Sequence, residues 1–110
     1  MGKADLLSNI LPGGRGVWIP IDHGVSDYPV EGLKDIEFTI KSLISAGVDA
    51  IIAHKGVVGH YHKLCENTKT SMIVHLSAST RHGGSESSNK VLVGSVDEVR
   101  KRGGSGVSCQ

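Results

Sequence analysis

Apolar residues of this chain gather in short continuous runs, separated by polar and glycine-rich segments. The runs at 16–21, 49–54 and 71–76 do not alternate apolar with polar positions, as the strands of a half-exposed antiparallel sheet would. Their length and β-branched content fit buried strands better than helices. We therefore predict three buried strands, the second and third of them buried on both faces.

The spacing of apolar and charged residues predicts helices between the strands. From Gly32 to Ala46 apolar residues recur at steps of three and four, which is the stripe of an amphipathic helix, and Gly47 stands where a C-cap belongs. The segment 96–102 has acidic residues early and basic residues late, the order that the helix dipole favours. A strand, a helix and a second strand form a βαβ unit, and repeated units of this kind predict a parallel sheet.

The remaining segments complete the expected pattern. A polar leader ends at 12–14, a further short strand is predicted at 90–93, and another strand begins at 106–108. The Ser- and Gly-rich segment 78–89 is expected to be a mobile loop at the mouth of the sheet. Glycines in 103–106 are expected to weaken the preceding helix end and the last strand.

Two closed parallel α/β architectures fit this order of elements: the doubly wound sheet and the barrel. A dinucleotide-binding doubly wound fold would need GxGxxG at the start of the first helix. Here Asp22-His23-Gly24 follows the first predicted strand instead. The comparison favours the barrel.

Length and charge narrow the possible functions. The 110 residues allow one small domain. Because 12 Lys and Arg face 11 Asp and Glu, neither a nucleic acid nor an anionic membrane is expected as partner. The longest apolar run falls far short of the roughly 20 residues that span a bilayer, and the first residues lack the apolar region of a signal peptide. Cys65 and Cys109 suggest no disulfide framework. We expect a cytoplasmic protein.

Polar residues follow directly on each of the three predicted strands, where parallel α/β folds build their active sites. These residues are Asp22 and His23 after the first strand, His54 and Lys55 after the second, and His75 near the end of the third. Each also has a structural interpretation: Asp22 as an N-cap or loop anchor, the two later histidines as hydrogen-bonded core residues, and Lys55 as a solvated lysine. Their convergence at three strand ends favours a functional site.

Two kinds of chemistry are open to such a cluster. Asp22 and His23 could hold a substrate hydroxyl and move its proton, with Gly24 allowing close approach of the backbone. Alternatively, Asp22, His54 and His75 could ligate the metal of a barrel hydrolase. A second histidine pair, His60 and His62, is interpreted as two solvated loop residues.

Four stretches together resemble the archaeal-type class I aldolases: IPIDHGVSDYPVEGLKDI, AGVDAIIAHKGVV, MIVHLSAST and KVLVGSVDEVRKRGGSGVS. The resemblance covers nearly the whole chain from Gly16 onward. It implies the α/β class and the N-terminal half of a (βα)8 TIM barrel with parallel strands. Residues 1–110 would then form a partial aldolase domain of strands one to three and the start of strand four, truncated at the C-terminus.

The resemblance also implies a reaction. Family members join a lysine to a ketose phosphate as a Schiff base, exchange an aldehyde in an aldol or transaldol step, and use a tyrosine as proton donor, without a metal or other cofactor. One branch serves aromatic amino acid biosynthesis, and the His-Lys-Gly at 54–56 favours that branch over the fructose-bisphosphate aldolases, which remain an alternative. The positions of the lysine and the tyrosine have no match within 1–110. The chain alone is therefore expected to be inactive.

The residues that carry over are few. Asp22 matches the acid/base carboxylate of the family, and His23, Gly24, Val25 and Ser26 match its substrate-contacting loop. His54, Lys55 and His75 are added as substrate-binding candidates because of their strand-end positions. Half a barrel leaves edge strands and an inner face uncovered, so we also expect a homo-oligomer. A non-catalytic half-barrel that serves only as an assembly module is the remaining alternative.

Overall fold

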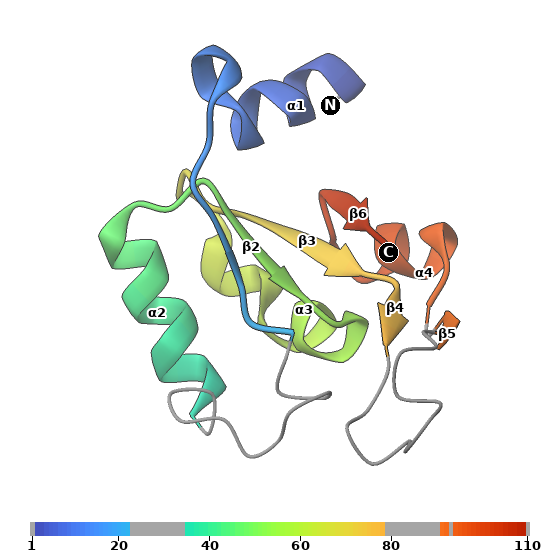
Figure 1. Cartoon of the computed structure of the whole chain (residues 1–110). Helices are drawn as coiled ribbons and strands as arrows, with labels where there is room; N and C mark the ends of the chain where they lie inside the picture. The colour runs from blue at the N-terminus through green and yellow to red at the C-terminus, as the bar shows by residue number, and fades with distance from the viewer. Residues whose placement is uncertain (1, 23–34, 79–90, 93, 110) are drawn as a thin grey trace, which may run out of the picture.

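A computed structural model describes residues 2–22, 35–78, 91–92 and 94–109 of the chain (Figure 1). Helices and strands alternate along most of it. In chain order the elements are α1 (Lys3–Ile10), the 3-10 turn η1 (Pro12–Gly14), β1 (Trp18–Pro20), α2 (Ile36–Ala46), β2 (Ala50–Ala53), α3 (Lys55–Tyr61), the 3-10 turn η2 (His62–Cys65), β3 (Ser71–His75), β4 (Ser77–Ala78), β5 (Val91–Leu92), α4 (Val96–Lys101) and β6 (Gly106–Ser108).

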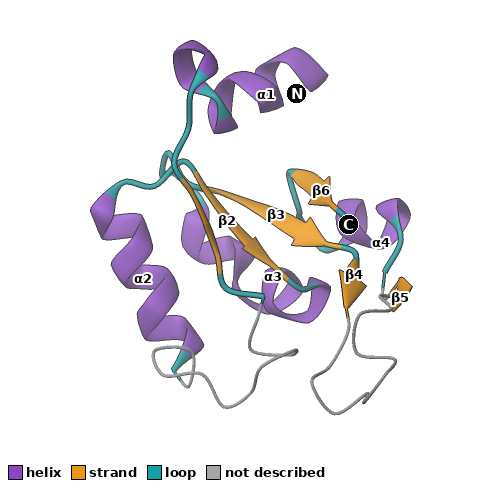
Figure 2. Ribbon diagram, in the orientation of Figure 1, coloured by secondary structure: helices purple, strands orange, loops and turns teal. Residues whose placement is uncertain are grey.

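The strands form a parallel sheet in the order β1-β2-β3-β6 (Figure 2). The order of the parallel strands across the sheet is thus the same as their order along the chain. This is the order of a barrel and not of a doubly wound sheet. The predicted half of a (βα)8 barrel is confirmed. The predicted strand at 90–93 is found as β5, but β5 pairs antiparallel with β4 in a separate two-stranded sheet and does not belong to the parallel sheet.

Helix α2 has the ends that its sequence favours. The Asp35 side chain accepts a hydrogen bond of 3.1 Å from the Phe38 backbone N–H, which satisfies one of the free donors of the first turn. Gly47 follows the last turn with a φ of 80°, a left-handed conformation that glycine adopts without a steric penalty. The predicted C-cap is confirmed. The described helix begins at Ile36, and residues 32–34 of the predicted helix lie outside the described residues.

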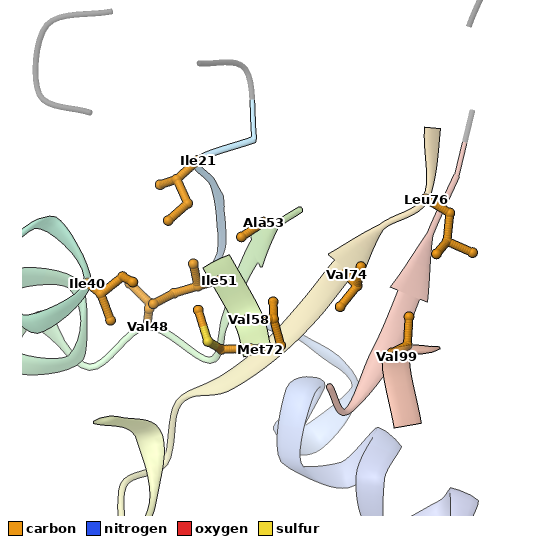
Figure 3. Packing of buried hydrophobic residues seen from close by; sticks show 10 residues of the cluster. All are labelled: Ile21, Ile40, Val48, Ile51, Ala53, Val58, Met72, Val74, Leu76 and Val99. Atoms are coloured by element: carbon orange, nitrogen blue, oxygen red, sulfur yellow. The ribbon is translucent and has the colours of Figure 1, made fainter. Parts of the chain in front are cut away.

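One face of the sheet packs against α2, α3 and α4 to form the main core (Figure 3). Ile51 of β2 is fully buried there, and each helix contributes one buried aliphatic side chain: Ile40, Val58 and Val99 respectively. Burial of a side chain of this size typically contributes about 1.5–3 kcal/mol. The apolar runs of the central strands β2 and β3 are thus buried, as predicted.

The opposite face of the sheet, called here the open face, is covered only in part. Ile10 of α1 packs against Ala50 and Ile73 on this face, and α1 lies at the end of the sheet where the strands begin (Figure 1). Trp18 of β1 stays 39% exposed. The prediction that the first strand is buried is therefore wrong, since none of the three residues of β1 is fully buried. Among the described strands, β1 has a neighbour on one side only.

Two glycines of the 103–106 segment are required by the packing. Gly103 has a φ of +86°, and a Cβ there would come within 2.5 Å of the His62 ring. A Cβ on Gly104 would come within 2.6 Å of Val99. These glycines let the chain turn from α4 into β6 against close neighbours, and the expectation that they also weaken the helix end and the strand stays a prediction.

A candidate active site at the carboxyl ends of the strands

The register of the sheet aligns the polar strand-end residues in one row. Pro20 pairs with Ile52 and Ala53 pairs with Val74. Continued to the carboxyl ends of the strands, these registers set Asp22 opposite His54, and His54 opposite His75. The pairing of His75 with Ser108 is formed directly. We call these four residues, Asp22, His54, His75 and Ser108, the strand-end row.

His75 is the centre of the contacts within the row. Its Nδ1 lies 2.8 Å from the Ser108 Oγ and 3.7 Å from the Asp22 Oδ2. On the other side of the ring, Nε2 lies 3.4 Å from the Ser77 Oγ. The side chains of His75 and Asp22 are only 12% and 17% exposed, so their interaction is less screened by water than a surface pair would be.

His54 lies beside His75 and has an unused polar atom. The two rings meet edge to face, with their centroids 5.9 Å apart. The His54 Nδ1 is buried and has no hydrogen-bond partner among the described residues. A buried polar atom left in this state typically costs about 1–3 kcal/mol. A ligand that offers a hydroxyl or another hydrogen-bonding oxygen would remove this cost.

Lys55 follows His54 of the strand-end row in sequence, but its side chain contacts helix α4. It begins α3, and its Nζ lies 2.8 Å from the Glu98 Oε2 of α4. Both side chains are more than a third exposed. The hydrogen bond from Lys55 is the main reason why the pKa of Glu98 lies below its ordinary value. Within this structure Lys55 links two helices.

The other candidates fall into two groups. His23, Gly24, Val25 and Ser26 lie outside the described residues, as does the predicted mobile loop apart from its first residue. His60 belongs to α3 and its ring contacts Tyr61, while His62 begins η2 and its Nδ1 lies 3.1 Å from the Val58 carbonyl oxygen. The prediction that both are loop residues is wrong. They belong to helical segments that extend the βαβ crossover.

Sequence reasoning missed Ser108. Its role depends on the register between β3 and β6, which places it directly opposite His75. In the sequence, Ser108 is only a polar residue at the third position of a predicted strand. Serine is too common at such positions to indicate a site. Ser77, in contrast, follows the third strand closely enough to be noticed from the sequence.

The row combines a carboxylate, two imidazoles and a hydroxyl. A carboxylate can accept a proton from a substrate hydroxyl, and a neutral imidazole can donate one hydrogen bond and accept another. Within the described residues, no three His, Cys, Asp or Glu side chains are grouped in a way that would hold a metal ion. None of the helices in these ranges is long and apolar enough to cross a membrane. The carboxylate, the two imidazoles and the hydroxyl together offer acid/base and hydrogen-bonding groups to a small polar molecule.

The chain is similar to one family of aldolases and to synthases from two archaea. Residues 17–110 match the family described as DeoC/LacD family aldolase. The chain is 34% identical to the 2-amino-3,7-dideoxy-D-threo-hept-6-ulosonate synthase of Halobacterium salinarum, in a match that covers 97% of this chain and 39% of the relative. A synthase of the same name from Archaeoglobus fulgidus is 32% identical, with 98% and 40% covered.

The chain is also similar to a bacterial synthase. The 2-amino-4,5-dihydroxy-6-oxo-7-(phosphonooxy)heptanoate synthase of Streptomyces griseus is 39% identical over 90 residues, which are 82% of this chain and 32% of the relative. The chain thus spans about two fifths or less of the length of these curated relatives.

Proposed function

Because this chain belongs to the DeoC/LacD family of aldolases, we propose that it supplies the N-terminal part of a Schiff-base aldolase or transaldolase. The substrates of that enzyme are a ketose phosphate and an aldehyde. The observation that carries this proposal is the strand-end row, which gathers Asp22 and His75 at the carboxyl ends of parallel strands. Family barrels use that end of the sheet for chemistry.

The names of the relatives support a narrower choice of substrate. The archaeal relatives are synthases of an amino-dideoxy-heptulosonate, and the bacterial one makes a phosphorylated amino-heptanoate. We place this chain with these synthases, in aromatic amino acid biosynthesis and in the cytoplasm, in preference to the fructose-bisphosphate aldolases. Substrate contact is assigned to His23, Gly24, Val25 and Ser26 by their match to the family.

Asp22 is assigned the acid/base role. Its carboxylate lies in a poorly exposed setting beside His75, where a proton can be taken from a substrate hydroxyl and returned. The buried Nδ1 of His54 is the second proposed substrate contact, since a hydroxyl of the sugar chain would supply the partner that this atom lacks. The substrate would then lie over the row, between the ends of β1 and β3.

The covalent step is assigned to a lysine outside residues 1–110. Lys55 is the strand-end lysine of this chain, but it is held in an ion pair with Glu98. That contact directs the amine of Lys55 to α4 and engages it in a structural ion pair. We therefore retain Lys55 as a structural residue at the rim of the site and not as the nucleophile.

Complementation tests this function. The purified chain would be mixed with the C-terminal part of the Halobacterium salinarum synthase, and ketose phosphate turnover would be measured. We expect activity only in the mixture, and a loss of roughly 100-fold or more with Asp22→Ala, given the usual contribution of a positioned acid or base. Asp97→Ala, on the exposed side of α4, is the matched control.

Borohydride trapping tests whether the chain alone forms a Schiff base with a ketose phosphate. The chain alone would be incubated with D-fructose 1-phosphate and borohydride, and its intact mass would be measured. No adduct is expected on the chain by itself. A stoichiometric adduct that maps to Lys55, or turnover in the mixture that is indifferent to Asp22→Ala, would contradict the proposed roles.

We also propose that copies of the chain associate with one another. Among the described strands, β1 and β6 each have one free edge, and Trp18 and Leu7 leave apolar surface exposed at the open face. Free edges and exposed apolar patches both favour association. A second copy offers a complementary pair of edges of the same parallel direction.

A further inference from the structure

We propose that His75 is a positioning residue, which holds the Asp22 carboxylate in place and is itself locked by the hydroxyls of Ser108 and Ser77. This inference rests on the acid/base role proposed for Asp22. It is carried by geometry, because three partners surround one imidazole ring at 2.8, 3.4 and 3.7 Å. His75 does not itself face a reacting bond in this assignment.

The partners of the ring select one neutral tautomer. Nδ1 faces both Ser108 and Asp22, and an ionised carboxylate can only accept hydrogen bonds. The proton therefore belongs on Nδ1, where it is donated to Ser108 Oγ. The Asp22 oxygen, 3.7 Å from Nδ1, lies beyond hydrogen-bond distance and is attracted by the positive end of the same N–H bond. Nε2 is then an acceptor, and the Ser77 hydroxyl can donate to it across 3.4 Å.

The setting of the ring supports this role. His75 ends β3, a strand paired on both sides, so its backbone is fixed by the sheet. The ring of His54 closes one side at a centroid distance of 5.9 Å, and the His75 side chain is 12% exposed. A side chain fixed on a strand and supported by neighbours positions a reactive group more accurately than one on a loop.

Nitrogen NMR of the histidine side chains tests the inference on the chain itself. In the chain labelled with ¹⁵N, at about pH 8 where an ordinary histidine is neutral, we expect His75 to show a protonated Nδ1 and an unprotonated Nε2. Ser108→Ala should remove this signature and give a mixture of tautomers. Ser108→Thr, which keeps the hydroxyl, should restore it.

Two further variants complete the design. Asp22→Asn should move the Nδ1 resonance of His75, because an amide can donate as well as accept. Ser45→Ala makes the same change as Ser108→Ala on the exposed surface of α2 and should move nothing. A spectrum with Nε2 protonated in the unmodified chain, or a His75 signature that survives Ser108→Ala and Asp22→Asn unchanged, would overturn the inference. Because this readout requires no turnover, its failure is separate from a failure of complementation.

Discussion

Asp49 ties together the chain segments that enter the first three strands. Its Oδ2 accepts a hydrogen bond of 2.8 Å from the backbone N–H of Val17, just before β1, and its Oδ1 lies 3.2 Å from the Lys69 Nζ, just before β3. These contacts lie at the amino ends of the strands, opposite the strand-end row. In this fold the amino ends serve stability and the carboxyl ends serve chemistry.

The first prediction concerns acid stability. The hydrogen bond from Val17, and secondly that from Lys69, hold the pKa of Asp49 below its ordinary value, against the opposing effect of burial. A carboxyl whose pKa is lower in the folded state stabilises the fold above its unfolded pKa, near pH 4. This stabilisation is lost as the pH falls through the lower folded value. Chemical unfolding between about pH 7 and pH 3 should therefore show a falling free energy of unfolding.

Asp49→Asn removes the titrating group and keeps its size. The variant should be less stable than the unmodified chain at neutral pH, and the gap between the two should narrow as the solution becomes acidic. Asp97→Asn, on exposed α4, should leave the curve unchanged. Parallel curves for the unmodified chain and Asp49→Asn over the whole range would show that Asp49 does not carry this effect.

The second prediction concerns a matched pair of glycines. Gly103→Ala should be destabilising, by more than about 1 kcal/mol, because Gly103 has a φ of +86° and its new methyl group would meet the His62 ring. Gly56→Ala has open space around it in α3 and should stabilise the chain by about 0.5–1 kcal/mol. Thermal unfolding of both variants measures this difference in stability. Stability changes of equal size and sign in the two variants would contradict the prediction.

The third prediction tests the main core. Ile51→Val deletes one methyl group from a fully buried position between the sheet and the helices and should cost about 0.5–1.5 kcal/mol. Phe38→Leu, at a position that is 69% exposed, should change the free energy of unfolding by less than about 0.5 kcal/mol. Denaturant titrations followed by circular dichroism compare the two. A larger loss at Phe38 than at Ile51 would mean that α2 packs by a different face.

The fourth prediction concerns self-association. Light scattering coupled to size exclusion should show dimers or larger species. Val107→Lys places a charge on the free edge strand β6, at a residue that is 43% exposed, and should shift the population toward monomer. Phe38→Lys adds the same charge on α2 and should not. A monodisperse monomer of the unmodified chain that unfolds cooperatively would contradict the association.

The sequence by itself determined the class of the fold and most of its elements. Continuous apolar runs identified β2 and β3 because central strands of a parallel sheet are buried on both faces. The spacing of apolar residues and Gly47 identified α2 in the same way, since both signals are local. Helix α1 escaped prediction because few of its residues are buried, Ile10 among them, so its apolar stripe is too short to recognise.

Only the tertiary structure decided which residues of the strand-end row meet. Asp22, His54 and His75 are visible as polar strand ends, but the register between strands is a relation of distant segments, and a slip of one residue would turn each side chain to the other face. That register brings Ser108 to His75 across a separation of 33 residues, and it leaves Lys55 to pair with Glu98. Local sequence patterns reveal which residues are buried, whereas the contacts within the strand-end row depend on pairing between distant strands, which no local pattern reveals.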